Sequence, residues 1–448
     1  NTGGKQMKLI YGIKDKPKFG QVILFALQQL LAIMAATIAV PAVVNSICGT
    51  ALTASAALFG AGCGSIVYLL FTKSSSPVFL GSSFAFIGSM CSAFAGAASL
   101  ALGYWGLIIG AAMAGLVYVI LAIVIKLCGV KWIDKLLPPV IIGPTVAIIG
   151  LSLAGNAVGD LTNGGSGSTY VALICGLVTL AVTMLAATYG KKGIKLIPFI
   201  IGILAGYLVA TVFYFIGKGT NNPALIVIDY SAFVGCGFFA LPDFTFILGN
   251  GALSEMNGAY LLTLFTAYVP VAFVVFAEHL ADHKNLSSIV GVNLLEEPGL
   301  TRTLLGDGIG SIVGTFFGGC PNTTYGESIA TVAITRNAST VSIWGAAFAC
   351  IIFSLIAPLV AFLETIPTCV MGGVCITLYG FIAVSGLKML QPVDLNDNRN
   401  LFTASAILIA GIGGMSISIG SVTLTEVACA LILGIIINLV FNRSSTKQ

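Results

Sequence analysis

Long apolar runs alternate with short polar breaks along almost the whole chain. Many of these runs approach or exceed the roughly 20 residues that an α-helix needs to cross a bilayer. Cutting the chain at its polar breaks predicts an all-α polytopic membrane protein with fourteen transmembrane segments. The predicted segments lie near residues 19–45, 51–72, 78–96, 101–127, 138–157, 168–189, 193–217, 258–282, 303–319, 322–337, 339–363, 368–389, 399–419 and 422–442.

The composition agrees with this pattern. Of the 448 residues, 57% are hydrophobic and 8% are charged, whereas soluble domains carry about a quarter charged residues. The eleven cysteines are scattered, without a C-x-x-C pair or a histidine cluster, so we expect no metal site and no cofactor. We see no catalytic set that predicts an enzyme. The basic residues are spread over the loops, which argues against nucleic-acid binding.

The basic residues predict the orientation in the membrane. If the N-terminus lies inside, nineteen of the twenty Lys and Arg residues fall in inside segments, and only Lys218 lies outside. The positive-inside rule then places both termini in the cytoplasm, with the plasma membrane as the expected location. The inside set is Lys5, Lys8, Lys14, Lys16, Lys18, Lys73, Lys126, Lys131, Lys135, Lys191, Lys192, Lys195, Lys284, Arg302, Arg336, Lys388, Arg399, Arg443 and Lys447.

Two of the predicted spans contain stretches that suit a helix badly, "SSPVFLGSSFAF" (75–86) and "GCPNTTYGESIA" (319–330). Irregular backbone is tolerated in a bilayer only where protein or a water-filled cavity satisfies its polar groups. We therefore predict short strands at Val78–Leu80 and Asn322–Thr324, with helices beginning near Ser83 and Glu327. The helix N-termini would aim free N–H groups at a ligand near mid-membrane. The alternative is that Pro and Gly merely kink two continuous helices.

The same two stretches indicate an internal repeat. They fall in predicted spans three and ten, and a second similar pair, "LPPVIIGPTVAIIG" (137–150) and "IPTCVMGGVCITLYG" (366–380), falls in spans five and twelve. Both pairs are seven spans apart. An odd number of spans inverts the second copy relative to the first, so the sequence predicts two inverted seven-span repeats, as in many secondary transporters.

Two carboxylates lie deep within predicted spans, Glu278 and Glu327. A charged side chain at that depth costs roughly 2.5–3.5 kcal/mol, so these two residues are candidates for function. Asp282 follows Glu278 by four residues and shares its helix face, while His279 and His283 share an adjacent face.

Other readings of these side chains remain open. Asp282 and His283 could form a solvated helix end at the cytoplasmic interface. His279 could be a packing residue with its hydrogen bonds satisfied. Gln28 and Gln29, in the first span, could link helices or face the site.

The stretches "GSSFAF" (81–86), "AEH" (277–279), "PNTTYGESIATVAITR" (321–336) and "LPPVIIGPTVAIIGLSLAG" (137–155) resemble the nucleobase–ascorbate transporter family, and within it the bacterial uracil permease branch. The resemblance covers nearly the whole chain. It implies fourteen spans divided into a core domain (spans 1–4 and 8–11) and a gate domain (spans 5–7 and 12–14). It also implies that the short strands of spans three and ten pair antiparallel with each other.

The resemblance sets the expected domain boundaries. The cytoplasmic N-terminal tail covers residues 1–18, and the gate domain ends in the C-terminal tail. The core domain is expected at 19–137 and 258–365, and the gate domain at 138–257 and 366–448. Family members are often homodimers through the gate domain, which is the expected assembly.

The resemblance also implies roles for individual residues. Glu278 matches the glutamate that binds the base ring, and Glu327 matches the acid that reads the edge of uracil. Phe84 matches a position whose backbone amide and ring meet the substrate, and Tyr325 and Gly326 supply backbone beside it.

Several further positions complete the expected site. Asp282 matches a position that is His or Asp in the family, and with Glu278 it is expected to couple transport to protons. Ser83 and Ser328 are expected to contact substrate, although many members carry Asn at the position of Ser328. Gln29 stands where members often carry His. Together with Gln28 and His279, it is a candidate for facing the site.

The function expected from these residues is import of uracil or a close pyrimidine by symport with H⁺, or with Na⁺ as the alternative ion. A purine permease for xanthine, urate or guanine is a second hypothesis within the family. An anion exchanger on the same fold is a third, but it needs a basic group near the site. Arg336, at a helix end, is the one candidate for that group.

Overall fold

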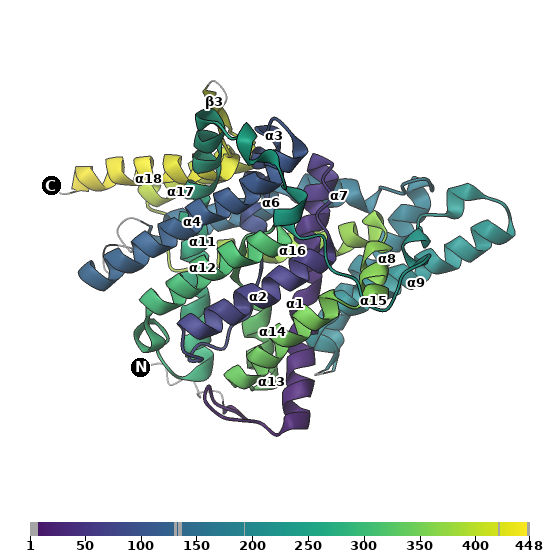
Figure 1. Ribbon diagram of the computed structural model, residues 1–448. Coiled ribbons are helices and arrows are strands. Elements are labelled where there is room, and N and C mark those ends of the chain that lie inside the picture. Colours follow the sequence, from purple (N-terminus) through teal and green to yellow (C-terminus); the bar gives the residue numbers. More distant parts are fainter. Residues whose placement is uncertain (1–7, 130–131, 133–136, 192, 420–421, 446–448) are drawn as a thin grey trace.

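The computed structural model describes residues 8–445 apart from 130–131, 133–136, 192 and 420–421. The chain is mostly helical (Figure 1), and each of the fourteen predicted ranges contains helix. The basic residues Lys5, Lys131, Lys135, Lys192 and Lys447 lie outside the described residues. The longer helices are α1 (Phe19–Cys48), α2 (Ala54–Phe71), α3 (Ile87–Ala95), α4 (Leu100–Cys128), α6 (Pro139–Ser152), α7 (Ala154–Leu161), α8 (Thr169–Tyr189), α9 (Pro198–Gly219), α11 (Gly258–Val290), α12 (Leu300–Gly318), α13 (Gly326–Thr335), α14 (Thr340–Ser354), α15 (Ala357–Glu364), α16 (Thr368–Lys388), α17 (Asn398–Ile412) and α18 (Glu426–Ser445).

Within the described part of the chain, eight helical segments are long and apolar enough to cross a membrane. They are α1, α2, α4, the continuous segment α6–α7, α8, α9, α11 and α16. The helices of the remaining predicted spans are shorter or less apolar, so the count of fourteen crossings stays a prediction.

A second hairpin corrects the predicted limits of the last two spans. Strand β3 (Ile417–Ile419) pairs antiparallel with β4 (Val422–Leu424) between α17 and α18. The spans expected at 399–419 and 422–442 are therefore wrong at their facing ends. The stretch "SISIGSVTL" alternates apolar and polar residues around a Gly-Ser pair, a pattern typical of a β-hairpin.

The predicted span at 339–363 is also interrupted. Helix α14 ends at Ser354 and α15 begins at Ala357, with Pro358 in its first turn, where a missing N–H is tolerated. The loop between α9 and α11 fills the break, because Ala240 N–H donates to Leu355 O at 3.1 Å and Ala357 N–H donates to Phe238 O at 3.0 Å. This loop also carries the short helix α10 (Thr245–Leu248).

At the centre of the molecule, strand β1 (Leu80–Ser82) pairs antiparallel with β2 (Asn322–Thr324), 240 residues further along the chain. Leu80 lies opposite Thr324, and Ser82 opposite Asn322. The structure confirms the antiparallel pair and the predicted position of β2. Strand β1 begins two residues later than predicted because Phe79 N–H donates to Ser328 Oγ (3.0 Å) instead of joining the ladder.

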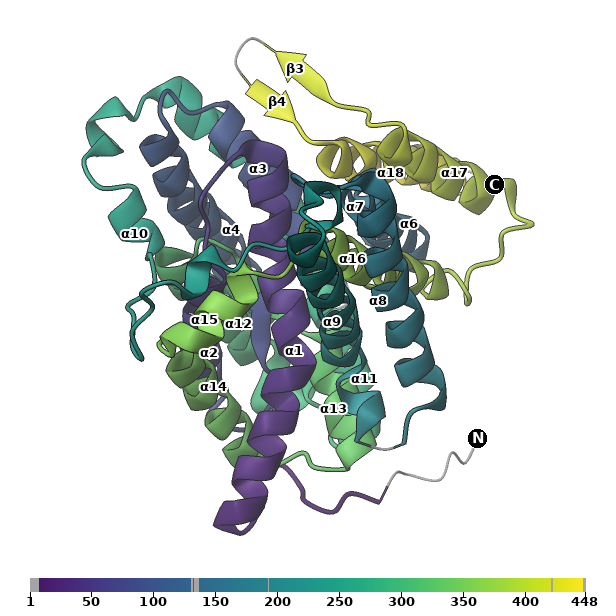
Figure 2. The same ribbon diagram turned by 90° about the vertical axis from the view of Figure 1, so that its right-hand side faces the viewer.

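The helices form two groups on either side of α1 (Figure 2). Helices α2, α4, α12 and α14 pack on one another in one group, and α6, α8, α9, α16, α17 and α18 pack on one another in the second. Helix α11 packs on α4 of the first group and also contacts α6 and α18 of the second. The two groups therefore meet along α1 and α11.

Glycines allow α2 and α12 to pack with their backbones in contact. A Cβ atom added to Gly64 would lie 2.7 Å from Gly310 O, and one added to Gly310 would lie 2.7 Å from Gly64 O. Small residues at such crossings allow the close approach that stabilises helix pairs in membranes. This packing fixes α12 beside the strand pair, because Ser311 Oγ of α12 accepts from Asn322 N–H at 3.0 Å.

Candidate functional site

The strand pair positions the beginnings of two helical segments. Strand β1 leads through Ser83 into the 3₁₀ turn η1 (Phe84–Phe86) and then α3, and β2 leads through Tyr325 into α13. Both stretches are therefore extended and then helical, and the alternative of two continuous kinked helices is wrong. Because the strands are antiparallel, the two helical segments leave the crossing in opposite directions.

A cavity of about 390 Å³ lies against the start of α13. Its volume falls within the roughly 300–1,000 Å³ of pockets that bind small molecules. Three carboxylate residues line it: Glu278, Asp282 and Glu327. The other lining residues are Ala32, Val146, Ala187, Lys195, Leu196, Pro198, Phe199, Ala281, Gly326, Ala330, Thr331, Ile334, Phe381, Ile382, Ser385 and Met389.

The three carboxylates come from two elements. Glu278 and Asp282 lie one turn apart on α11, whereas Glu327 lies in the first turn of α13, where the helix dipole favours negative charge. Asp282 Oδ2 accepts a hydrogen bond from Thr324 Oγ1 of β2 at 2.7 Å. Asp282 is therefore held at the strand crossing and does not form a free helix end.

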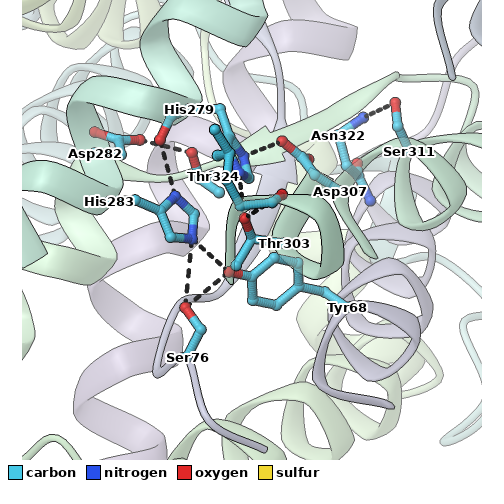
Figure 3. Close-up of polar contacts among 11 residues, drawn as sticks. Tyr68, Ser76, His279, Asp282, His283, Thr303, Asp307, Ser311, Asn322 and Thr324 are labelled. Carbon is cyan, nitrogen blue, oxygen red and sulfur yellow. Dashed lines mark hydrogen bonds and ion pairs between the residues drawn. The ribbon is translucent and has the colours of Figure 1, made fainter. Parts of the chain in front are cut away.

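The two histidines do not line this cavity, and both are fully buried. Figure 3 shows them among Asp307, Thr303 and Tyr68. His279 Nδ1 lies 2.7 Å from Asp307 Oδ2, and His279 Nε2 lies 3.0 Å from Thr303 Oγ1. His283 Nδ1 donates to His279 O at 2.8 Å, and its Nε2 lies 2.7 Å from Tyr68 OH. The expectation that His279 faces the site is not met, and the alternative of a solvated interface is wrong for His283.

Asp307 is a buried acid that the sequence analysis missed. It lies near the start of the predicted span 303–319, and a carboxylate in that position is readily interpreted as a residue at the membrane surface. The structure buries it completely in α12, 28 residues after His279. The signal in the sequence was its place within "GDG", since flanking glycines let neighbouring helices pack closely around the acid.

Three of the predicted site residues do not line the carboxylate cavity. Phe84 packs edge-on against Tyr379 of α16, with ring centroids 5.7 Å apart. Ser83 is buried, and its N–H donates to Pro321 O at 2.8 Å. The Tyr325 hydroxyl donates to Ser82 O at 2.7 Å, so its side chain braces the strands.

Phe84 instead lines a second cavity of about 470 Å³, which includes Asn156, Ser416 and Glu426 in its wall. The two cavities come close together along α6. Val146 lines the carboxylate cavity, and Ile149, one turn further along, lines the second. The walls of the two cavities therefore include residues that are three positions apart on this helix.

Ser328 joins three segments near the cavity, but it is fully buried and does not line it. Its hydroxyl accepts from Gln29 Nε2 of α1 and from Phe79 N–H before β1. Gln29 is buried with it, and the neighbouring Gln28 is half-buried outside the cavity wall. This bridge fixes the first turn of α13, which carries Glu327, against α1 and β1.

Replacing Ser328 with alanine should lower the free energy of unfolding by about 1–3 kcal/mol, because the change leaves two buried donors unpaired. Thermal melting of the purified protein in detergent measures the effect. Ser92→Ala is the matched control, since the Ser92 hydroxyl donates only to Gly88 O within its own helix, at 2.9 Å. Equal melting temperatures of the two variants would contradict the bridging role.

Among the described residues, no group of three or more His, Cys, Asp or Glu side chains is arranged to hold a metal ion. The carboxylates at the cavity are spread along its wall. The site can therefore offer hydrogen-bond acceptors and proton-binding groups to a small polar molecule.

Comparison with known structures shows a shared fold. The chain superposes on the transmembrane domain of the cyanobacterial bicarbonate transporter BicA with a TM-score of 0.64, at 16% identity, covering 95% of this chain and 100% of that one. It superposes on the murine anion transporter Slc26a9 in its inward-facing state with a TM-score of 0.65, at 14% identity, covering 97% of this chain and 70% of that one.

Comparison of sequences is more specific. Uracil permease of Bacillus caldolyticus is 40% identical over 437 residues, which cover 97% of this chain and 95% of the relative. Uracil permease of Escherichia coli (strain K12) is 35% identical over 442 residues, covering 98% and 95%. The sequence profile described as the Permease family matches residues 20–420. This multi-pass membrane protein therefore belongs to that permease family, the nucleobase–ascorbate transporters.

Proposed function

We propose that the chain imports uracil, or a close pyrimidine nucleobase, by symport with protons. The observation that carries the proposal is the convergence of Glu278, Asp282 and Glu327 on one cavity beside the N-terminus of α13. Similar chains that carry the name uracil permease support this choice of substrate.

The chemistry of the cavity suits uracil. The base is small, neutral and planar, with two N–H donors and two carbonyl acceptors. The carbonyl oxygen of a protonated Glu278 and the carboxylate of Glu327 can accept from the N–H groups, and free backbone N–H groups at the start of α13 can donate to a carbonyl. Gly326 is exposed to this cavity, so the backbone there is accessible to a ligand. In this proposal Glu278 carries the proton while substrate binds and releases it inside.

Transport requires the cavity to open to each side in turn. We assign residues 19–137 and 258–365 to a core domain and residues 138–257 and 366–448 to a gate domain, which moves relative to the core. The two groups of packed helices and the two cavities support this division. Lys195 and Met389 in the wall of the carboxylate cavity adjoin loops expected inside, so this state is inward-facing, with both termini cytoplasmic. A homodimer through the gate domain remains the expected assembly.

Anion exchange is disfavoured by the charges of the cavity. Three carboxylates line it, and Lys195 is the one basic residue among the described lining residues. Arg336 ends α13 and is absent from that lining. An anion would therefore meet like charge without a compensating cluster of basic groups.

Uptake of labelled uracil into proteoliposomes, with and without an inward proton gradient, tests the proposal, and competition by xanthine tests the purine alternative. The wild type should accumulate uracil only with the gradient and should resist competition by xanthine. Replacing Glu327 with glutamine should weaken uracil binding about 10-fold or more, because a neutral amide is a weaker acceptor than a carboxylate. The proposal would be overturned if uptake by the wild type did not depend on the proton gradient, or if the wild type preferred xanthine to uracil.

A further inference from the structure

The buried pair of His279 and Asp307 lies outside the cavity that binds substrate in the proposed function. Both side chains are fully buried between α11 and α12. In the part of the chain that the structure describes, His279 is the one ion-pair partner of Asp307. The other oxygen of this carboxyl group, Oδ1, has no hydrogen-bond partner there. A buried carboxylate with a neutral partner would leave one uncompensated negative charge, which is costly in a membrane.

The Thr303 hydroxyl lies between two acceptors and can donate its single proton to either of them. Leu300 O lies 3.1 Å from the hydroxyl oxygen, and His279 Nε2 lies 3.0 Å from it. When the hydroxyl donates to Leu300 O, the Nε2 atom must be the donor in its contact with Thr303. If Nε2 carries a hydrogen, the 2.7 Å contact between His279 Nδ1 and Asp307 Oδ2 contains a second proton, shared between imidazole and carboxyl.

We propose that His279 and Asp307 form a second proton-holding site of this transporter, and that the Thr303 hydroxyl is the positioning group that adapts to its state. This inference rests on the proposed proton symport. In the loaded state the pair has no net charge, whichever of the two groups holds the shared proton.

Release sends one proton to solvent and leaves an Asp307 carboxylate that accepts from His279 Nδ1–H. The His279 Nε2 atom then becomes an acceptor, and the Thr303 hydroxyl turns from Leu300 O to donate to it. Every buried donor thus keeps a partner in both states, and the net charge of the pair changes from zero to −1.

The surroundings of the pair can couple it to the cavity. Helix α11 carries Glu278, which immediately precedes His279 and lines the cavity. Asp282, one helical turn after Glu278, lines the cavity as well. His283 stacks on His279 with ring centroids 4.1 Å apart. Three other titratable groups lie on elements packed against α11. The ring of Tyr118 of α4 meets the ring of His279 edge-on, with centroids 6.3 Å apart. Tyr68 of α2 is hydrogen-bonded to His283, and Glu327 of α13 lines the cavity. A negative charge that appears on Asp307 therefore acts on the proton affinity of the cavity carboxylates.

The test replaces Thr303 with valine, which has nearly the same shape but no hydroxyl. The loaded state then leaves the His279 Nε2–H donor unpaired, and the released state leaves the neutral Nε2 atom without a donor. The first loss is the larger one, because the imidazole of the loaded pair shares a positive charge, so the pair binds its proton more weakly. The pH that gives half-maximal uracil uptake should move down by about one to two units. Thr303→Ser, which restores the hydroxyl, should return the profile to that of the wild type.

Thr315→Val is the matched control, because Thr315 is equally buried in α12 and its hydroxyl donates only to Ser311 O, at 2.8 Å. An unchanged pH profile in Thr303→Val, or an equal shift in Thr315→Val, would overturn the inference. A second variant, Asp307→Asn, should keep counterflow exchange of uracil and lose the response of uptake to the proton gradient. If uptake by Asp307→Asn depends on the proton gradient as strongly as uptake by the wild type, this inference alone is wrong. If uptake by the wild type does not depend on the gradient, the proposed function is wrong.

Discussion

Replacing Glu278 with glutamine is expected to abolish proton-driven accumulation of uracil while changing uracil binding by less than about 10-fold. Binding is largely kept because glutamine, like the protonated carboxyl group that meets uracil in the proposed function, is neutral and can both donate and accept hydrogen bonds. The coupling loss follows because glutamine cannot take up a proton. Asp282 and Glu327 line the same cavity, but neither occupies the position of Glu278.

Two measurements on the same preparation separate these effects. Thermal stabilisation of the purified protein by uracil reports binding, and uptake into proteoliposomes under an inward proton gradient reports coupling. Glu364→Gln is a suitable control, because Glu364 is an exposed residue at the end of α15 and lies outside the carboxylate cavity. Gradient-driven uptake by Glu278→Gln at the wild-type rate would refute the assignment.

Adding one methyl group at the strand crossing is expected to have the largest effect on stability. A Cβ atom on Gly81 of β1 would collide with the ring of Tyr325 and lie 2.9 Å from Thr37 Oγ1. The ring would have to move, which breaks its hydrogen bond to Ser82 O. Overpacking of a buried site typically costs about 1–3 kcal/mol, and loss of a buried hydrogen bond adds to that.

Gly81→Ala should therefore melt at a clearly lower temperature than the wild type and lose uracil binding, since the same strands position α13. Gly155→Ala provides the comparison: it lies in α7, where an added Cβ meets no atom within 4 Å. It should be neutral or slightly stabilising, because alanine favours a helix more than glycine does. If the two variants melt together, the crossing tolerates more movement than its packing indicates.

Local chemistry allowed the strand crossing to be predicted from sequence. Proline, paired threonines and glycine within an apolar run exclude a regular helix, and the charge of Glu327 beside them indicates a helix start. The prediction was two residues off for β1, since the hydroxyl that captures Phe79 N–H belongs to Ser328, in a distant part of the chain. Local sequence could not contain that information.

Side-chain direction explains the remaining differences. The expected substrate contacts of Ser83 and Ser328 assumed that residues next to a site point into it. In the structure both side chains are buried: the Ser328 hydroxyl binds Gln29 and Phe79 N–H, and the Ser83 hydroxyl has no hydrogen-bond partner among the described residues. The pairing of His279 with Asp307 depends on how α11 meets α12, which single-sequence spacing does not fix. The β3–β4 hairpin differs, because its alternating apolar and polar residues are a local signal. The prediction missed this signal because the apolar runs on both sides were assigned to membrane spans.

The short distance between the two cavities has an electrical consequence. Val146 and Ile149 are three residues apart on α6, or about 5 Å along the helix axis, whereas the hydrocarbon layer is about 30 Å thick. If the two cavities fill with water from opposite sides of the membrane, most of the membrane voltage drops across the protein between them. A single charge that crosses this layer then gains nearly the full driving force, about 2.3 kcal/mol for each 100 mV.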